Sequence, residues 1–301
     1  MKIYYGLEKI RKFKNPVVVL GIFDGVHLAH KKILVSARNK ARQIKGTSVF
    51  VTFWPHPQKE GSLYSLEHRL KLIAMLGIDA GIVINFNKKF SRISAEKFVK
   101  DILVRKIRPS YIYIGKTFTF GKNAAGGFEL LKKLAKECGF KVKVFKTLKV
   151  NGRIVSSTII RKLIKAGKLD GLKKLLTRQV CILGTVIKGD SFARKLGYPT
   201  ANIDPHHEVL PPSGVYAVKV IHKGKKFSGV CSIGHKPTFT DKKIQHIEVN
   251  IFNFHKNIYG ANLEIEFIKL LRKQEKFPSA AILSKQIGKD VILAKKVISR
   301  H

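Results

Sequence analysis

The sequence predicts an α/β protein with two domains: an N-terminal domain with a parallel sheet, then a small antiparallel β-barrel with a terminal helix. A length of 301 residues suffices for two domains. In the first half, short apolar runs alternate with amphipathic helical stretches, as in βαβ units. From Val180 onward, strand-like runs separated by turn residues follow one another, which favours a barrel. We place the boundary near 178–184 and assign residues 1–180 and 181–301 to the two domains.

The elements of the first domain follow from hydrophobic periodicity. Five β-branched apolar runs read as buried strands: 16–23, 47–54, 80–86, 109–115 and 140–146. Helices are expected over 30–46, 66–77 and 94–107, and Gly46, Gly77 and Gly139 lie where helix C-caps belong. The predicted buried helix faces are Ile33, Leu34, Ala37 and Ala41; Leu66, Leu70, Ile73 and Leu76; and Ala95, Phe98 and Ile102 with Val104 or Arg105. Ligands of such parallel sheets bind beyond the carboxyl ends of the strands.

The second domain shows shorter, more closely spaced strand signals. Apolar runs at 180–187, 214–233, 246–254 and 263–271 predict antiparallel strands, and the run 214–233 is expected to be a hairpin that turns at Gly224. The final stretch 279–298 has helical periodicity, with Ser279 as its N-cap. Residues 156–176 contribute two further helical pieces between the domains.

Composition excludes some classes of protein. Only three cysteines occur, and no two form a CxxC pair, which argues against a disulfide scaffold or a zinc knuckle and fits a reducing cytoplasm. The charged N-terminal residues predict no secretory signal, and no apolar run reaches membrane-spanning length. The formal net charge is +40, but the lysines are spread over both halves. Such an excess predicts non-specific attraction to polyanions and does not by itself predict a nucleic-acid partner.

The segment GIFDGVHLAH, residues 21–30, carries two histidines at the end of the first predicted strand. The spacing of His27 and His30 allows a metal pair, a phosphate cradle or two unrelated surface residues. A metal pair needs further ligands, and only Asp24 lies close. A strand, a glycine turn and a helix start together form an anion site, because the first helical N–H groups are unpaired. We therefore favour the phosphate cradle.

These residues also resemble a known family. GIFDGVHLAH is similar to the GxFDGxHxGH signature of nucleotidyltransferases, and the fuller pattern resembles the bifunctional riboflavin kinase/FMN adenylyltransferases of prokaryotes, also called FAD synthetases. Three further segments resemble the adenylyltransferase motifs: 51–57, 113–127 and 155–164. Five resemble the kinase motifs: 184–203, 211–218, 229–239, 247–260 and 263–277. The resemblance thus spans nearly the whole chain in one order.

The resemblance implies that the first domain is a Rossmann-like nucleotidyltransferase that joins FMN to the adenylyl group of ATP and releases pyrophosphate. Such a site aligns and neutralises two anions and needs no protein nucleophile. By this resemblance the ATP-binding residues are Gly21, Phe23, Asp24, Gly25, His27, His30, Ser157, Thr158 and Arg161, of which His27, His30 and Arg161 are catalytic. The flavin-binding residues are Phe53, Pro55, Phe118, Phe120 and Gly121. Without the resemblance, Ser157 and Thr158 read as a simple helix cap, and the two phenylalanines at 118 and 120 as core.

The second domain is implied to be a riboflavin kinase, in which Glu248 takes the proton of the riboflavin hydroxyl as it attacks the γ-phosphate of ATP. The ATP-binding residues are Gly189, Arg194, Gly197, Pro199, Thr200 and Asn202, with the loop 189–197 around the phosphates. Thr200 and Asn202 also hold Mg²⁺, which prefers oxygen ligands. The flavin contacts are Glu248 and Arg272. From alternation alone, Glu248 reads as an exposed strand position opposite Ile247, Val249 and Ile251.

Four positions depart from the family pattern: Ala29, Thr117, Ala193 and Ser232. None of them removes a charged or proton-handling residue, so we expect both activities, with riboflavin, FMN and ATP as substrates and no membrane partner. Two alternatives stay open. One is a kinase with a degenerate adenylyltransferase domain, for which Ala29 and Thr117 are the argument. The other is a nucleic-acid-binding protein on a retired enzyme scaffold, which the net charge invites.

Overall fold

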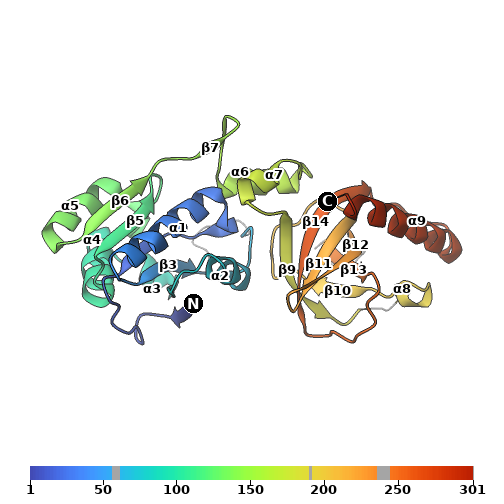
Figure 1. Cartoon of the computed structure of the whole chain (residues 1–301), viewed down its shortest axis with the longest axis horizontal. Coiled ribbons are helices and arrows are strands. Elements are labelled where there is room, and N and C mark those ends of the chain that lie inside the picture. Colours follow the sequence, from blue (N-terminus) through green and yellow to red (C-terminus); the bar gives the residue numbers. More distant parts are fainter. Residues whose placement is uncertain (56–61, 190–191, 236–244, 301) are drawn as a thin grey trace. The chain divides into compact units, whose positions relative to one another are not determined.

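The computed structural model describes all residues except 56–61, 190–191, 236–244 and 301 (Figure 1). Two predicted motif segments, 51–57 and 229–239, therefore lie partly outside the described residues. The chain divides into two compact units: Met1–Glu60 with Leu66–Ser157, called unit 1, and Gly61–Ser65 with Thr158–His301, called unit 2. Each unit is described by itself.

Unit 1 contains a six-stranded sheet in which every neighbouring pair is parallel, in the order β1-β4-β3-β2-β5-β6. The strands are β1 (Lys2–Tyr5), β2 (Val17–Leu20), β3 (Ser48–Trp54), β4 (Ala80–Asn85), β5 (Tyr111–Gly115) and β6 (Lys141–Phe145). Five of them confirm predicted strands, and β1 was not predicted. The order reverses direction at β2, because β3 and β4 continue to one side and β5 and β6 to the other. The carboxyl end of β2 is therefore the switch point where such sheets bind ligands.

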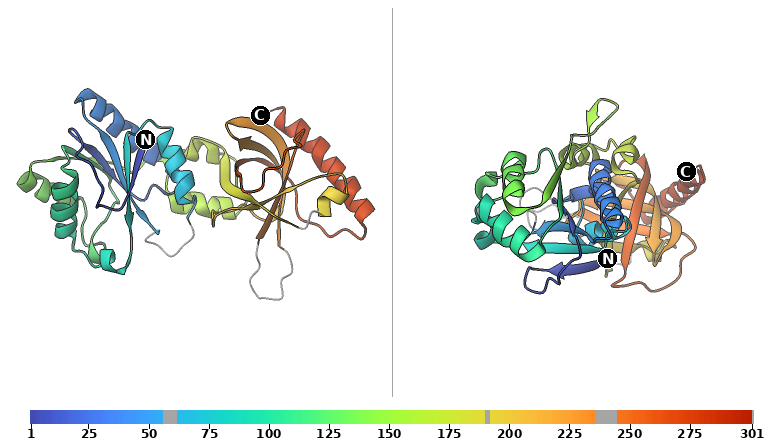
Figure 2. Two further views of the ribbon diagram at one scale, coloured as in Figure 1. Left: turned by 90° about the horizontal axis from the view of Figure 1, so that it is seen from below. Right: turned by 60° about the vertical axis from the view of Figure 1, so that its left-hand side comes forward.

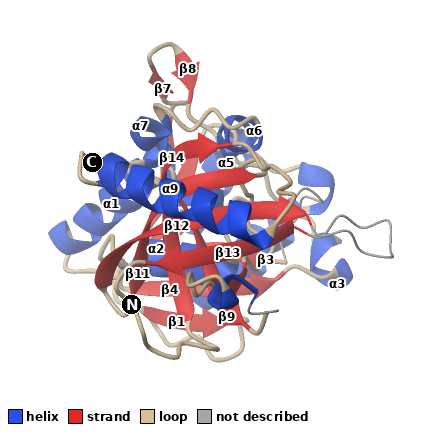
Figure 3. Ribbon diagram, turned by 90° about the vertical axis from the view of Figure 1, so that its right-hand side faces the viewer, coloured by secondary structure: helices blue, strands red, loops and turns tan. Residues whose placement is uncertain are grey.

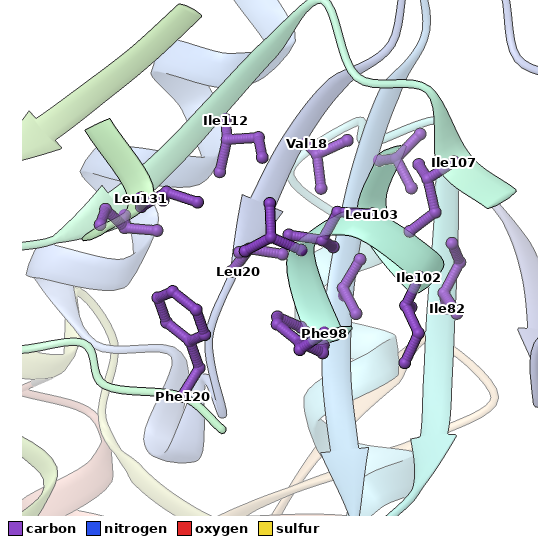
Figure 4. Close-up of a cluster of buried hydrophobic side chains, with 14 of the residues drawn as sticks. Val18, Leu20, Ile82, Phe98, Ile102, Leu103, Ile107, Ile112, Phe120 and Leu131 are labelled. Atoms are coloured by element: carbon purple, nitrogen blue, oxygen red, sulfur yellow. The ribbon is translucent and has the colours of Figure 1, made fainter. Parts of the chain in front are cut away.

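Helices cover both faces of this sheet (Figure 2). They are α1 (Leu28–Gln43), α2 (Leu66–Ala74), α3 (Lys88–Ser91), α4 (Ala95–Lys97), the continuous π-helix η2 (Phe98–Ile107) and α5 (Phe128–Cys138), with short 3₁₀ turns η1 (Asp24–Val26) and η3 (Lys122–Ala124). Alternation along β2 directs Val18 and Leu20 into the apolar cluster with Phe98 and Leu103 of η2 (Figure 4). This core holds the switch-point strand rigidly in place.

The helices of unit 1 agree with the predicted buried faces and helix ends in part. The buried face of α1 is Ile33, Leu34, Ala37 and Ala41, as predicted. The C-cap of α1 is Ile44, so the prediction of Gly46 as the C-cap was wrong by two residues. The left-handed residue between them is Lys45, with φ 49°. In η2 the buried residues after Ile102 are Leu103 and Ile107, and not Val104 or Arg105. The reason is the π-helical hydrogen bonding, which adds a residue to each turn and shifts the inward face.

Unit 2 is a closed antiparallel barrel in the order β10-β13-β12-β11-β14-β9. Its strands are β9 (Val180–Ile187), β10 (Ala201–Asp204), β11 (Gly214–His222), β12 (Lys225–His235), β13 (Gln245–Ile251) and β14 (Asn262–Arg272). The hairpin of β11 and β12 turns at Lys223 and Gly224, both with positive φ, which confirms the predicted turn. Among the described strands of this barrel, the short β10 was not predicted.

Helices complete unit 2. Helix α9 (Ala280–Ile298) begins after Ser279, whose side chain accepts the N–H of Ile282 as predicted, and it lies across the outer wall of the barrel (Figure 3). The shorter helices are α6 (Ser157–Lys165), whose first residue belongs to unit 1, α7 (Leu172–Leu176) and α8 (Phe192–Lys195). A separate two-stranded hairpin, β7 (Lys149–Val150) with β8 (Arg153–Ile154), precedes α6. Among the described residues, none of the helices is both long and apolar enough to cross a membrane.

Candidate functional sites

The first candidate site forms where β2 ends. Gly21 follows the strand, the 3₁₀ turn Asp24–Val26 comes next, and His27 is the N-cap of α1. Phe23, Gly25 and Val26 all have positive φ, at 56°, 77° and 37°. Glycine adopts such angles without strain, whereas Phe and the β-branched Val do so only when their surroundings hold them. The turn directs the N-terminus of α1 toward the switch point of the sheet.

The two histidines lie together. Their rings are stacked with centroids 3.7 Å apart and planes inclined by 16°, and Phe23 packs edge-on against the ring of His30. His27 is 4% exposed, and its Nδ1 accepts the backbone N–H of His30 at 3.4 Å. Since Nδ1 accepts, the proton of a neutral His27 ring sits on Nε2. The prediction of two unrelated surface residues is thereby excluded.

The turn Asp24–Val26 also forms a hydrogen bond with the first residue of α6. Ser157 Oγ donates to the carbonyl of Asp24 at 2.8 Å, so the start of α6 is tied to the turn. Thr158 and Arg161 lie further along α6 in unit 2, and Arg161 is 4% exposed. The joint action of Arg161 with the histidines stays a prediction. Ala29 lies half-buried in the first turn of α1, at the departure from the family pattern.

The predicted flavin residues of unit 1 separate into two groups. Phe53 and Phe120 are 7% and 6% exposed and belong to the apolar core. Phe120 is drawn there in Figure 4. Phe118 is half-buried and stacks on Phe120, with centroids 6.0 Å apart, while Pro55 is exposed at the end of β3. Gly121 has φ 78°, and a Cβ there would meet the backbone of Ala95 at 2.6 Å. Phe118 and Pro55 are thus the members of the set that a ligand can reach, and Thr117 beside them is exposed.

The second candidate site is a cavity of about 670 Å³ in unit 2, bounded by the outer wall of the barrel, α9 and the segment around α8. Its walls differ in character. One is apolar and is lined by Val215, Val230, Phe277, Leu283, Ile287 and Val291. The other is polar and is lined by Thr200, Asn202, Ser232, Glu248 and Asn250. A cavity of this size with a few convergent polar groups is typical of small-molecule sites.

Glu248 lies in the middle of the polar wall. Its neighbours Ile247 and Val249 are each 1% exposed and point into the barrel, so alternation places the carboxylate on the opposite, cavity-facing side of β13. Asn202 on β10 and Ser232 on β12 are its cross-strand partners. Thr200 Oγ1 donates to Glu248 Oε2 at 3.3 Å. The structure therefore brings together three of the residues that the sequence predicted to work in one site.

Ser232, the cross-strand partner of Glu248 on β12, is a departure from the family pattern. Ser232 Oγ accepts a hydrogen bond from Gln274 Nε2 at 3.3 Å, which ties the polar wall to the segment after β14. Asn250 Nδ2 donates to the carbonyl of Pro199 at 2.7 Å and so fixes the approach to β10. Neither Asn250 nor Gln274 was predicted, because an amide on an alternating strand or in a loop carries no distinctive sequence signal.

Arg272 lies at the other end of the cavity, beside α9. Its Nε donates to both carboxylate oxygens of Asp290, at 3.0 and 3.1 Å, and its Nη2 donates to Oδ2 at 2.8 Å. Gln286 Nε2 donates to the same carboxylate at 2.9 Å. The guanidinium stacks near the ring of Phe277, 5.3 Å from its centroid. The fork geometry fixes both the arginine and the helix that carries Asp290.

The predicted phosphate loop 189–197 is only partly a loop, and residues 190–191 lie outside the described residues. Phe192–Lys195 form the helical turn α8, a correction to the predicted loop, and Ala193 is its second residue. Gly197 has φ 87°, which explains its glycine. A Cβ at Gly189 would overlap the side-chain amide of Asn202. Arg194 is exposed and is absent from the lining of the cavity.

Two buried groups behind the polar wall have shifted pKa values. Burial raises the pKa of the Cys231 thiol, and the nearby Glu248 carboxylate raises it further. Burial likewise raises the pKa of Tyr216 to about 12, with a smaller contribution from Cys231. Tyr216 donates to the Pro212 carbonyl at 2.6 Å. Both groups are therefore neutral at physiological pH.

Comparisons with known proteins match both halves. Residues 9–159 match the family model described as FAD synthetase, and residues 176–298 match that described as riboflavin kinase. Proteins named bifunctional riboflavin kinase/FMN adenylyltransferase are 38% identical in Buchnera aphidicola from Schizaphis graminum and 34% in Haemophilus influenzae, with 98% of each chain covered. A crystal structure from Streptococcus pneumoniae, named a macrolide-efflux protein, has a TM-score of 0.84 at 26% identity, with 98% of this chain and 99% of that chain covered.

Proposed function

Because this chain belongs to the family of bifunctional riboflavin kinase/FMN adenylyltransferases, we propose that its two sites divide the family's two reactions between residues 1–180 and 181–301. The chain phosphorylates riboflavin to FMN with ATP and adenylylates FMN to FAD with release of pyrophosphate. Family models match both halves, which favours two activities over a kinase alone. What remains to be assigned is which residues perform each step.

The cavity of unit 2 is the kinase site in this proposal. The observation that carries it is the convergence of Glu248, Thr200 and Asn202 on one polar wall, opposite an apolar wall of the kind that a flavin ring requires. Glu248 accepts the proton of the riboflavin hydroxyl while that oxygen attacks the γ-phosphate of ATP. Arg272, held by Asp290, bounds the flavin end of the cavity.

The residues around Glu248 also fit a divalent cation. Thr200 supplies a hydroxyl oxygen and Asn202 an amide oxygen, both hard donors that line the same cavity as the carboxylate. We assign Mg²⁺ to them, beside the phosphates of ATP, where the ion would neutralise negative charge during transfer. Gly189, Arg194, Gly197 and Pro199 complete the predicted ATP-binding set.

The turn after β2 is the adenylyltransferase site in this proposal. The positive end of α1 and the stacked imidazole rings of His27 and His30 all favour an anion at this place. The residues there bind and orient the phosphates of ATP, and Phe118 with Pro55 contact the flavin. Ser157, Thr158 and Arg161 hold the pyrophosphate end. The product is released without a covalent enzyme intermediate.

The cysteines and the net charge bear on the cellular location and the partners of the enzyme. Three cysteines without a disulfide, Cys138, Cys181 and Cys231, support a location in the reducing cytoplasm. We propose small molecules as its partners and attribute any affinity for nucleic acid to its net charge of +40.

A product assay on the purified chain tests the kinase assignment. Glu248→Gln keeps the shape of the side chain and removes the base, so FMN formation from riboflavin falls by at least about a hundredfold. Formation of FAD from added FMN by the same variant stays at the wild-type rate and serves as the internal control. FMN formation that survives in Glu248→Gln would reject the assignment.

A further inference from the structure

We propose that Thr52 and Arg69 are positioning residues for adenylyl transfer, because they jointly hold the Ile22 carbonyl and so fix the turn that carries His27 and His30. The inference rests on the proposed assignment of that turn to ATP. Thr52 lies in the motif segment 51–57 and Arg69 lies outside the motif segments, and neither residue was predicted to belong to a site. Both lie in unit 1.

Two donors from different elements converge on one oxygen. Thr52 Oγ1, on β3, donates to the Ile22 carbonyl at 3.0 Å, and Arg69 Nη1, on α2, donates to the same oxygen at 2.6 Å. A carbonyl oxygen has two lone pairs, so both bonds are satisfied together. Thr52 is 2% and Arg69 1% exposed. Ile22 is thus tied to the sheet on one side and to a helix on the other.

The Ile22 carbonyl lies directly before the strained part of the turn. Ile22 directly precedes Phe23, the first residue of this turn with positive φ. Asp24 directly follows Phe23, and its carbonyl accepts a hydrogen bond from Ser157 Oγ. The two anchored carbonyls therefore flank the point where the backbone leaves its ordinary conformation. Strained backbone of this kind persists where the surrounding structure over-determines it, typically at functional sites. We infer that the anchors hold the turn ready for the phosphates.

An arginine at position 69 is unexpected on packing grounds alone. Its helical neighbours Leu70, Leu72 and Ile73 are apolar and buried, and burying a guanidinium is unfavourable unless it is hydrogen-bonded. The guanidinium also lies 5.2 Å from the ring of Trp54, which is 36% exposed and directly precedes Pro55 of the predicted flavin loop. One side chain therefore contacts both the turn assigned to ATP and the strand end assigned to the flavin.

Steady-state kinetics of the full chain test the proposal, with FMN adenylylation as the readout and riboflavin phosphorylation as the internal control. Thr52→Val is isosteric and removes one donor, and we expect kcat/KM for adenylylation to fall about tenfold, mostly in kcat, as for one lost hydrogen bond that positions reacting groups. Thr52→Ser, which keeps the hydroxyl, restores most of the loss. Arg69→Lys reaches Ile22 without the planar stack on Trp54, so KM for FMN rises as well.

A matched control separates positioning from general stability. Arg38 Nη1 donates to the Leu76 carbonyl at 2.8 Å, the same chemistry in the same unit away from the turn, so Arg38→Lys leaves adenylylation unchanged. The proposal is overturned if Thr52→Val adenylylates FMN as fast as wild type, or if it lowers both activities equally. Failure of the underlying site assignment shows differently: a His30→Ala variant would then retain adenylylation, whatever the Thr52 variants do.

Discussion

His27 caps α1 and lies in the turn that we assign to ATP. Its Nδ1 accepts the N–H of His30, and this bond fixes the orientation of the ring. Backbone geometry thus sets the chemistry of the side chain. Glu248 is placed by a different device, the strict alternation of β13, which separates it from its buried neighbours.

Substitution of His27 separates its two roles. Asparagine is a good N-cap, so His27→Asn keeps the free energy of unfolding within about 0.5 kcal/mol of wild type, whereas His27→Ala lowers it by about 1 kcal/mol. Both variants lose FMN adenylylation to a similar extent, because neither has an imidazole. Urea denaturation and the adenylylation assay check this. Full activity in His27→Asn would show that only the cap matters.

Ala29 gives a second residue-scale prediction. Replacing it by the glycine of the family pattern, Ala29→Gly, removes a methyl group beside His30, and we expect a lower KM for ATP in adenylylation. The same change lowers the free energy of unfolding by up to about 1 kcal/mol, since glycine disfavours helix. Kinetics at varied ATP concentration measure the effect. An unchanged or higher KM would show that the methyl does not limit the approach of the nucleotide.

Tyr216 predicts a dependence of stability on pH. Its pKa is raised from 10 to about 12 by burial, so above pH 10 the unfolded state loses the phenolic proton first. The contribution of Tyr216 is therefore complete below pH 10 and is lost as pH rises toward 12, at up to about 1.4 kcal/mol per pH unit. Denaturation of wild type and Tyr216→Phe across this range shows converging curves. Parallel curves would contradict the shift.

Single residues were predicted where a motif marks them and were missed where only tertiary contacts do. Glu248 and Thr200 are in contact as expected. The motifs indicate which two residues are functional, and the pairing of the barrel strands brings them together. Arg69 and Asp290 were not predicted. Each occupies one position on an amphipathic helix, where a charged residue ordinarily indicates a solvated face, and only the packed structure shows what it contacts.

At the scale of elements, helix α9 packs against the barrel through an apolar face. Within this face, the carboxylate of Asp290 forms hydrogen bonds with Arg272 and Gln286. Asp290 is 4% exposed and joins Arg272 of β14 to Gln286 of the same helix. Around it, Val215, Val230 and Ala294 form the apolar cluster beneath the helix. The contact closes one end of the cavity, so the flavin end of the kinase site depends on the seating of this helix.

Removal of the Asp290 carboxylate is expected to weaken the packing of α9 against the barrel. Asp290→Ala leaves Arg272 without its buried partner, which lowers the stability of unit 2 by about 3 kcal/mol. Native-state hydrogen exchange over 280–298 becomes faster, and KM for riboflavin rises, while FMN adenylylation keeps its wild-type rate. Unchanged exchange in the helix together with an unchanged KM would show that Asp290 does not seat it.

Element prediction succeeded where hydrophobic periodicity is regular and failed where it is not. Apolar runs predicted the strands of the sheet and the barrel other than β1 and β10. Spacing and turn chemistry predicted α1 and the hairpin at Gly224. The inward face of η2 was misassigned because π-helical bonding alters the period, which the sequence does not signal. β10 and α8 were missed because neither of these four-residue elements, ANID and FARK, carries an apolar run like the VVVL of β2.

At the scale of the whole molecule, each candidate site is built from a different architecture. The parallel sheet of unit 1 offers a helix N-terminus at its switch point, which suits anions, whereas the barrel of unit 2 offers a lined cavity on its outer wall. The central claim is therefore that the two reactions use separate residues and that FMN is the link between them.

Complementation between two inactivated chains tests this claim most directly. His30→Ala converts riboflavin to FMN only, and Glu248→Gln converts FMN to FAD only, so neither variant alone forms FAD from riboflavin and ATP. An equimolar mixture does so, because FMN released by one chain is adenylylated by the other, and chromatography of the products follows it. FAD formed from riboflavin by either variant alone, or a mixture that stops at riboflavin, would contradict the account.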